Sequence, residues 1–534
     1  MTRIPKYLIL FFASWAMFLP LQAQLQHLEC GWEYYALQER LTGNAHSSIY
    51  PLYRCDVVDT TLIAPKDLLN YTFTNYEADG KYYRVKKFIF SAQPLIHSEI
   101  LFNTGSNFSG GYGAGVLFDA EYNNTIATHF DLSYVNFAMT DYINEFRLRT
   151  GVLPGTGRVI KQRFPQNIYS NFNITYRPFQ LITLEAGFGK HFWGDGYRSM
   201  MLSYNAYNYP YIMADLNVWH VQYRFVVAQM KDINVPEGTV WGDFKTKYAY
   251  IHYIDWKVCK WFNFGAFEAI ISGVNHGFEP GYLNPVIFYR PVEFSLGSVD
   301  NALMGINLKF KLLKNTYLYG QFVLDDFNVD EFMNDIRHLR NPDDSEIHYG
   351  FFGNKVAGQI GLKSSNIGGI NYLHAFTEFN FARPYTYSHV VSQQNYGHFN
   401  QSLAHPLGAN FVESVSGISY LHKRFLFEGK FMLAFTGLDT TGTHFGQDIY
   451  KPTMDALQNG NIPVSTWYNR IGQGIETNII YTELSAQYFI NPDRNLSAII
   501  SIGLRHQQNE LATQQNVLIK IGVSGLLIRR YTDF

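Results

Sequence analysis

Residues 191–198 contain the kinds of side chain that a sugar-binding site needs. Gly194 and Gly196 border Asp195 and follow Trp193, so the chain can turn here and present an aromatic face beside a carboxylate. A sugar has one apolar face and a rim of hydroxyl groups, which suits stacking on a ring and hydrogen bonding to polar groups. The candidate residues are Trp193, Asp195, Tyr197, Arg198 and Asn205. A second interpretation is architectural: these residues lock the loop in place, with Arg198 paired to Asp195.

Later stretches of the chain share this aromatic, glycine-rich and amide-rich composition. They are residues 279–285, 300–305, 319–326, 382–387 and 403–410. The further candidate sugar-binding residues within them are Tyr282, Tyr385, Tyr387 and His405.

The sequence contains no recognisable catalytic or metal-binding constellation. Asp325 and Asp326 are adjacent, so on a strand they would point to opposite faces and could not act together as acid and base. Asp326 and Asn328 resemble the start of a calcium-binding loop, but Glu331 stands where the turn glycine belongs. The histidines within residues 374–405 lack the spacing of a zinc-binding helix. We therefore expect no enzymatic activity, no metal and no cofactor.

The composition is typical of a membrane-spanning β-barrel. Aromatic residues make up 17% of the 534 residues, with 39 Tyr and 43 Phe, and charged residues only 16%; about 25% charged residues is usual for soluble proteins. After the N-terminal region no apolar run reaches about 18 residues, which excludes helical membrane spans. A barrel meets lipid outside and water inside, and aromatic girdles mark its two interfaces. The net charge of −2 and the lack of a basic block argue against a nucleic-acid partner.

The N-terminus has the pattern of a secretory signal peptide over residues 1–23. Arg3 and Lys6 precede the apolar run 7–19, and residues small enough for cleavage precede Gln24. Export followed by a barrel indicates the outer membrane of a Gram-negative-type envelope.

Residues 24–84 differ from the rest of the chain and are expected to form a small, partly helical segment on the periplasmic side. Residues 32–41 have helical spacing. Export implies an oxidising compartment, so Cys30 and Cys55 could form a disulfide that leaves Cys259 over. The alternative, in which all three cysteines stay reduced or buried, remains open.

Residues 85–534 show the two-residue alternation of β-strands. Ile168, Ile174 and Tyr176, for example, alternate with Asn and Thr side chains. The same pattern recurs in residues 129–134, 182–189, 219–225 and 517–524. Period two places each set on one face of a strand. Every backbone polar group must be paired in lipid, so such strands predict an all-β fold, a closed antiparallel transmembrane barrel.

The connections between these segments predict about eighteen strands. Tight turns are expected near residues 123–124, 177–178, 216–217, 257–260, 312–315, 365–366, 422–423 and 491–493. Long connections are expected around residues 106, 150, 200, 238, 285, 340, 395, 455 and 511. Short turns normally face the periplasm and long loops the outside, so both chain ends should fall on the periplasmic side.

A barrel of this size is too wide for its wall side chains to fill, so it must hold water or take in its long loops. Function therefore belongs to the loops and the lumen. The last residue, Phe534, matches the terminal aromatic residue that outer-membrane barrels commonly carry, although Arg530 and Thr532 stand where apolar residues are expected.

Taken in order, the aromatic stretches from 191–210 to 403–410, together with residues 47–51, resemble the Wzi family of outer-membrane capsule-assembly proteins. They resemble its RemB-like gliding-motility relatives more closely, over most of the mature chain. The resemblance implies an eighteen-stranded barrel that binds surface (capsular or extracellular) polysaccharide at its outer face and helps to attach or assemble it. It also implies contact with outer-membrane lipid and other envelope proteins, and a link to gliding motility. It assigns no individual sugar-binding residue.

Three other functions fit parts of this pattern. A general diffusion porin or solute channel shares the fold and differs in whether the lumen is open. An outer-membrane enzyme acting on lipid or glycan has no motif in its favour. A structural partner of a motility or secretion apparatus is suggested by the RemB-like similarity alone.

Overall fold

The computed structural model describes residues 46–53, 88–104, 107–123, 125–158, 166–234, 244–273, 277–284, 300–440, 442–453, 466–491, 496–526 and 528–534. The expected signal peptide (residues 1–23), Cys30, Cys55 and most of the segment 24–84 lie outside these residues, so those features stay predictions. Cys259 is a free cysteine.

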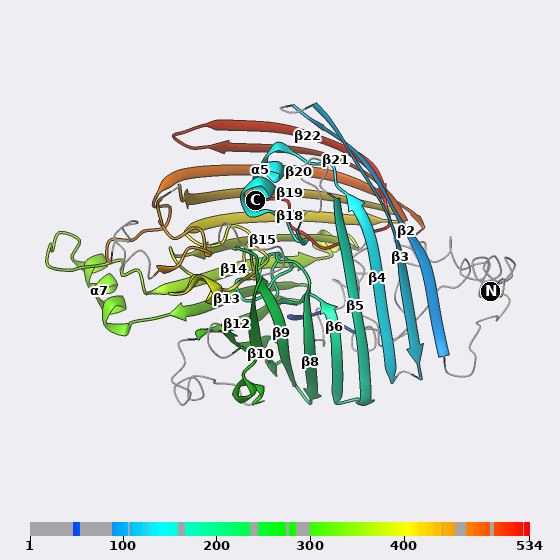
Figure 1. Ribbon diagram of the computed structural model, residues 1–534, viewed down its shortest axis with the longest axis horizontal. Helices are drawn as coiled ribbons and strands as arrows, with labels where there is room; N and C mark the ends of the chain where they lie inside the picture. The colour runs from blue at the N-terminus through cyan, green and yellow to red at the C-terminus, as the bar shows by residue number, and fades with distance from the viewer. Residues whose placement is uncertain are drawn as a thin grey trace, which may run out of the picture.

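Eighteen antiparallel strands close into one barrel, which confirms the predicted fold class (Figure 1). The wall strands are β2 (Phe88–Asn103), β3 (Asn107–Tyr122), β4 (Ile126–Asn136), β5 (Gln166–Phe179), β6 (Ile182–Gly189), β8 (Tyr209–Val218), β9 (Val221–Asp232), β10 (Lys245–Cys259), β11 (Phe262–Ser272), β12 (Asn301–Leu313), β13 (Thr316–Asp326), β14 (Lys355–Ser365), β15 (Leu373–Ala382), β18 (Phe411–His422), β19 (Phe425–Leu438), β20 (Ile475–Asn491), β21 (Leu496–Gln508) and β22 (Thr513–Ser524). Each pairs with the next wall strand along the chain, and residues 97–103 of β2 pair with 518–524 of β22 to close the barrel.

The wall is apolar outside, and its inward face is polar over strands such as β5. In β5 the outward Ile168 and Ile174 are 49% and 48% exposed, whereas the inward Asn167 and Asn173 are 2% and 3% exposed. Alternate residues of a strand face opposite sides, so the two-residue pattern of the sequence becomes two surfaces. This polarity reverses that of a soluble protein and suits a wall surrounded by lipid.

The tight turns and the connections between them lie at or within a few residues of their predicted positions. Two connections predicted to be long are not: only residues 104–106 join β2 to β3, and only 509–512 join β21 to β22. In the second, the Asn509 side chain accepts hydrogen bonds from the backbone N–H groups of Leu511 (3.0 Å) and Ala512 (2.8 Å). The polar residues of this segment therefore stabilise a tight turn and do not indicate a long loop.

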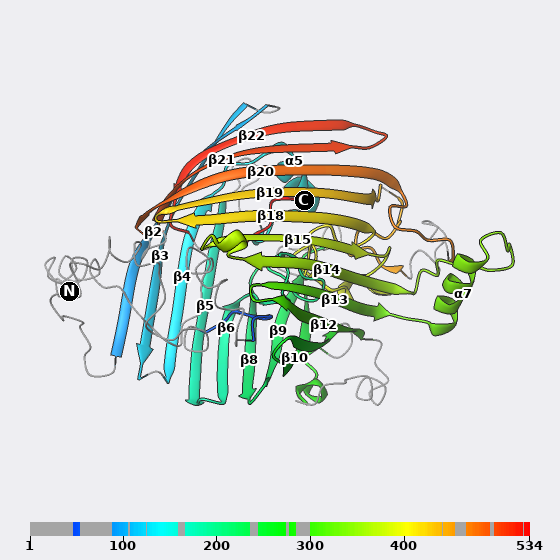
Figure 2. The ribbon, with the colours of Figure 1, turned by 180° about the vertical axis from the view of Figure 1, so that it is seen from behind.

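Two helices lie in the longer connections of the described chain. α5 (Asp141–Thr150) begins after Thr140, whose side chain accepts a hydrogen bond from a backbone N–H of the first turn, and ends at Gly151 in the left-handed conformation. α7 (Val329–Arg340), capped by Asn328, projects beyond the ends of β13 and β14 (Figure 2). Within the described residues, no helix has both the length and the apolar character needed to cross a bilayer.

The lumen contains inward-folded segments that we call the plug: residues 46–53, 190–208, 383–410, 442–453 and 528–534. Within it β1 (Ile49–Tyr50) pairs with β7 (Phe192–Trp193), and β16 (Gly397–His398) pairs with β17 (Gln401–Ser402). Apolar plug side chains and the inward faces of the wall strands around β8–β12 form one buried core. Several of the long connections, among them residues 190–208 and 383–410, therefore fold inward, as one of the two sequence-based alternatives required.

Residues 46–53 lie inside the barrel, although the sequence placed them in a periplasmic segment. His46 Nδ1 is 2.6 Å from Asp255 Oδ2 on the inner wall. Arg224 Nη1 donates to the Pro51 carbonyl (3.0 Å). This short segment is held there because it supplies the strand partner of β7 and satisfies charged groups of the wall.

The C-terminal residues leave the wall and enter the lumen. β22 ends at Ser524, opposite His97 in the middle of β2. The chain then turns, with the Gly525 N–H donating to the Ile96 carbonyl (2.8 Å). Figure 1 places the C-terminus beside α5, within the outline of the barrel.

The expectations for Phe534 and for a C-terminus on the periplasmic side are therefore wrong. Phe534 does not end the last strand; its ring lies 5.3 Å from that of Phe146 in α5. The physical reason lies in Arg530: on a strand with Phe534 facing lipid, Arg530 would face lipid as well, which is costly. In the lumen its guanidinium lies 3.6 Å from the centre of the Phe137 ring, and Asp533 is paired with Arg198.

Candidate functional site

Trp193 lies in the buried core of the plug and is 0% exposed. Its ring lies 5.5 Å from Tyr253 and 6.1 Å from Phe267, both on the inward face of the wall. Its backbone N–H donates to the Leu202 carbonyl (2.8 Å). The indole thus fills a core position, with no face open to solvent in this conformation.

Asp195 is held by partners from the N-terminal segment and the wall. Its carboxylate accepts hydrogen bonds from Ser47 (3.2 Å), Asn307 (2.9 Å) and Lys309 (2.9 Å). Burial raises the pKa of Asp195, but Lys309 and Lys363 together with Asn307 lower it by more, so the pKa lies below its ordinary value. The carboxylate is therefore ionised and paired at neutral pH.

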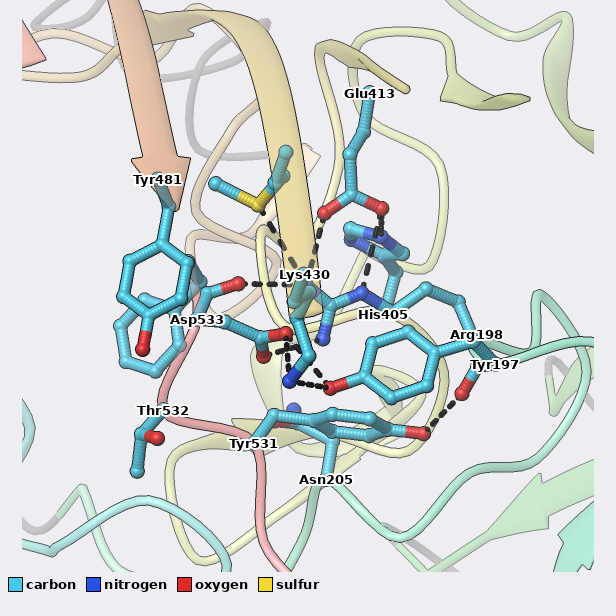
Figure 3. A network of polar contacts seen from close by, with 12 residues as sticks. Tyr197, Arg198, Asn205, His405, Glu413, Lys430, Tyr481, Tyr531, Thr532 and Asp533 are labelled. Atoms are coloured by element: carbon cyan, nitrogen blue, oxygen red, sulfur yellow. Dashed lines mark hydrogen bonds and ion pairs between the residues drawn. The ribbon is translucent and has the colours of Figure 1, made fainter. Parts of the chain in front are cut away.

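Arg198 occupies the centre of a buried network of charged groups (Figure 3). Its Nη2 lies 2.9 Å from Glu413 Oε1 and its Nη1 lies 3.1 Å from Asp533 Oδ1. His405 Nε2 is 2.8 Å from Glu413 Oε2, and the Tyr197 hydroxyl donates to Asp533 Oδ2 (2.7 Å). Arg198 thus pairs with β18 and the C-terminal residues, and not with Asp195 as the architectural interpretation had it.

Asp533 ties the C-terminal end to both the plug and the wall. Besides Arg198, Lys430 of β19 lies 3.0 Å from its Oδ2. Burial raises the pKa of Asp533, but Arg198 and Lys430 lower it by more, so the group is ionised at neutral pH. The Tyr531 hydroxyl also donates to the Tyr197 carbonyl (2.8 Å). A fixed C-terminal end is the result.

Three further candidates connect plug segments through side-chain hydrogen bonds to backbone carbonyls. These bonds run from Asn205 to Ser402 (2.9 Å), from Tyr387 to Met200 (2.7 Å) and from Tyr385 to His444 (3.0 Å).

Tyr282 lies apart from the other candidates, on the outer side of the wall. It belongs to η1 (Pro280–Leu283), and its ring lies 5.2 Å from that of Tyr250 in β10. Tyr250 faces away from the lumen because Tyr253, three residues on, faces into it. The Tyr282 hydroxyl donates to Asp300 (2.9 Å). The structure therefore gathers eight of the nine predicted sugar-binding residues in the plug and separates the ninth.

The contacts of the eight plug residues join the loops, the wall and the C-terminal residues to one another. Arg198, Asp195 and His405 are each 2% exposed or less and engaged by protein partners. Sugar binding by these residues stays a prediction. Within the described residues, no group of three or more His, Cys, Asp or Glu side chains could hold a metal ion.

The buried His398 predicts that acid destabilises the plug. Its Nδ1 accepts from the Lys231 backbone N–H (2.9 Å), which fixes the neutral ring, and burial lowers its pKa to about 3. Protonation then favours the unfolded chain, so stability is complete above about pH 6.5 and falls as the pH drops towards 3, by up to about 1.4 kcal/mol per pH unit. Unfolding midpoints between pH 8 and pH 5 measure this slope. His398→Gln should flatten it; an unchanged slope would contradict this role.

Comparison with known proteins gives a structural likeness only. No protein-family model and no curated protein sequence matches the chain. One similar solved structure is Wzi of Escherichia coli, which is described as an outer-membrane protein involved in group 1 capsule assembly and as a carbohydrate-binding β-barrel. The TM-score is 0.54 and the sequence identity is 12%, and the match covers 92% of this chain and 96% of that chain. OprD of Pseudomonas aeruginosa (TM-score 0.40, 9% identity, 82% and 96% covered) and OccAB2 of Acinetobacter baumannii (0.41, 9%, 82% and 97%) are more distant.

The likeness is one of fold. At 12% identity, the similarity to Wzi shows a shared β-barrel fold and assigns no residue a role. The closer resemblance to RemB-like proteins has no support in these comparisons.

A second group of residues, not selected from the sequence, lies where α7 meets the connection between β19 and β20. We call it the outer aromatic cluster; its members are His338, His348, Tyr349, Trp467 and Tyr468. The Trp467 ring stacks on His348 (4.9 Å between centroids, 26° between planes), and Tyr349 stacks on His338 of α7 (3.7 Å, 7°). Tyr468 is 51% exposed.

The outer aromatic cluster is held by hydrogen bonds from both sides. The Tyr468 N–H donates to the Tyr349 carbonyl (2.6 Å), and the Tyr468 hydroxyl lies 2.8 Å from His348 Nδ1. Trp467 Nε1 donates to Glu331 of α7 (3.2 Å). The sequence signal was present, because residues 348–352 and 466–468 are rich in aromatic side chains, but their proximity could not be read from the chain.

Proposed function

We propose that the protein is a non-enzymatic outer-membrane barrel that binds surface polysaccharide at its long-loop end and helps to attach or assemble it. The observation that carries the proposal is the plug, whose buried ion pairs and packed aromatic side chains fill the lumen beside an apolar outer wall. Ordered protein within the lumen leaves less room for a diffusion pore, which favours the loop surface as the place where a ligand binds.

The outward wall supports the location and the lipid partner. The outward side chains of β5 and β21 are apolar and about half exposed, Ile168 at 49% and Ile500 at 51%. Such a surface is stable in the hydrocarbon region and costly in water. Export by the predicted signal peptide 1–23 would deliver the chain to the outer membrane. The likeness in fold to Wzi, described as carbohydrate binding, agrees with this function without assigning it.

Two measurements on the detergent-purified protein test the proposal. We expect binding to surface glycan on an array and no steady conductance in planar bilayers. Steady large conductance without glycan binding would contradict the proposal and favour the alternative, a general diffusion porin or solute channel. Loss of surface-glycan retention in cells that lack the gene is the expected result in vivo.

The link to gliding motility rests on the RemB-like resemblance alone and stays a prediction. Co-purification of the barrel with motility or other envelope proteins checks it.

A further inference from the structure

We propose that the outer aromatic cluster is the glycan-docking surface, and that it takes a neutral or amino-sugar-containing glycan rather than one rich in uronic acid. This inference rests on the proposed function and gives it a site and a ligand class. It is carried by the exposed rings, by their rigid support and by the charge of the surrounding loop.

The rings offer stacking surfaces at the solvent boundary. Tyr468 is half exposed and His348 is exposed, whereas Trp193 in the plug is fully buried. Trp467 lies against His348, so indole, imidazole and phenol rings gather in one place. The apolar face of a pyranose ring can pack on such a surface and leave its hydroxyl groups at the edge.

The cluster is held in shape before any ligand arrives. Tyr468 has a φ of 65°, which is unusual for a bulky residue, and its backbone and hydroxyl bonds to Tyr349 and His348 hold it there. A surface that is held in shape in this way loses little entropy when a ligand docks. Hydrogen-bonding groups lie directly beside the rings: Glu331 accepts from Trp467, and Asn334 donates to Glu331 (3.4 Å). They suit sugar hydroxyl groups.

The connection that carries α7 is acidic. Between residues 326 and 354 the acidic residues are Asp326, Asp330, Glu331, Asp335, Asp343, Asp344 and Glu346, and the cationic ones are Arg337 and Arg340. The side chains of Asp343, Asp344 and Glu346 are exposed. Such a field repels a polyanion and attracts protonated amines, so it selects against uronic acid polymers.

The experiment compares binding of the full-length, detergent-purified protein to immobilised neutral, amino-sugar and uronic acid polysaccharides. We expect Tyr468→Ala and Trp467→Ala each to weaken binding of the neutral or amino-sugar polymer about tenfold, and Tyr468→Phe to retain most of it. Trp219→Ala is the matched control: Trp219 is 95% exposed but lies in the tight turn between β8 and β9, at the opposite end of the barrel. Unchanged heat-modifiable gel mobility confirms that each variant is folded.

The outcomes separate the inference from the proposed function. Binding by the wild type that survives both alanine substitutions overturns the docking surface and leaves the proposed function standing. Preference for the uronic acid polymer overturns the ligand class. Failure of the wild type to bind any glycan overturns the proposed function itself. Replacing Asp343, Asp344 and Glu346 with their amides should raise binding of the uronic acid polymer; no change would also overturn the charge argument.

Discussion

Arg198→Met destabilises the folded barrel by about 3–5 kcal/mol, because it leaves two buried carboxylates without their shared partner. Glu413 and Asp533 are each 1% exposed and lie 2.9 Å and 3.1 Å from the guanidinium. Urea unfolding, followed by the gel mobility of unheated samples, measures the loss.

The matched control for Arg198 is Arg470→Met. Arg470 pairs with Glu476 at a similar distance (3.0 Å), but the two side chains are 75% and 54% exposed. Exposed pairs contribute little, so the midpoint should move by less than about 1 kcal/mol. Equal effects of the two substitutions would show that the buried network does not hold the plug.

Trp193→Ala also costs about 3–5 kcal/mol, the usual range for removing a large aromatic side chain from a core. The cavity would lie against Tyr253 and Phe267, within the barrel where the plug meets the wall. Thermal unfolding of the purified barrel, combined with glycan binding of the fraction that stays folded, measures both consequences.

The two interpretations of Trp193 predict opposite results. A core residue changes stability and leaves glycan binding of folded protein intact, whereas a sugar-stacking residue changes binding and leaves stability intact. Trp219→Ala removes an exposed indole and should change neither. Lost binding at unchanged stability would restore Trp193 as a sugar ligand.

The wall could be predicted from the sequence because each strand needs only local information. Ile168 and Asn167 differ in polarity, they must face opposite sides, and lipid decides which one faces out. The positions of the turns could be predicted for the same reason, because each turn depends on a few adjacent residues. The length of the connection at residues 104–106 was missed because composition marks a turn and a loop alike.

The interior could not be predicted because its contacts join distant parts of the chain. Arg198 contacts Glu413 and Asp533, which are 215 and 335 residues away. Nothing in the local pattern around Arg198 distinguishes these partners from the neighbouring Asp195. The candidates stand out in the sequence by composition, yet their burial follows from how the loops fold inward. The outer aromatic cluster could not be predicted for the same reason, because His348 and Trp467 come into contact only in the folded loops.

The enclosed position of Phe534 has a practical consequence for handling the protein. An affinity tag or fluorescent reporter fused after this residue would have to thread out past α5, displacing the ring from Phe146. Such fusions should assemble poorly compared with fusions placed in an exposed turn, such as the one at Trp219. The wall thus encloses Phe534 together with the residues of the plug that it contacts.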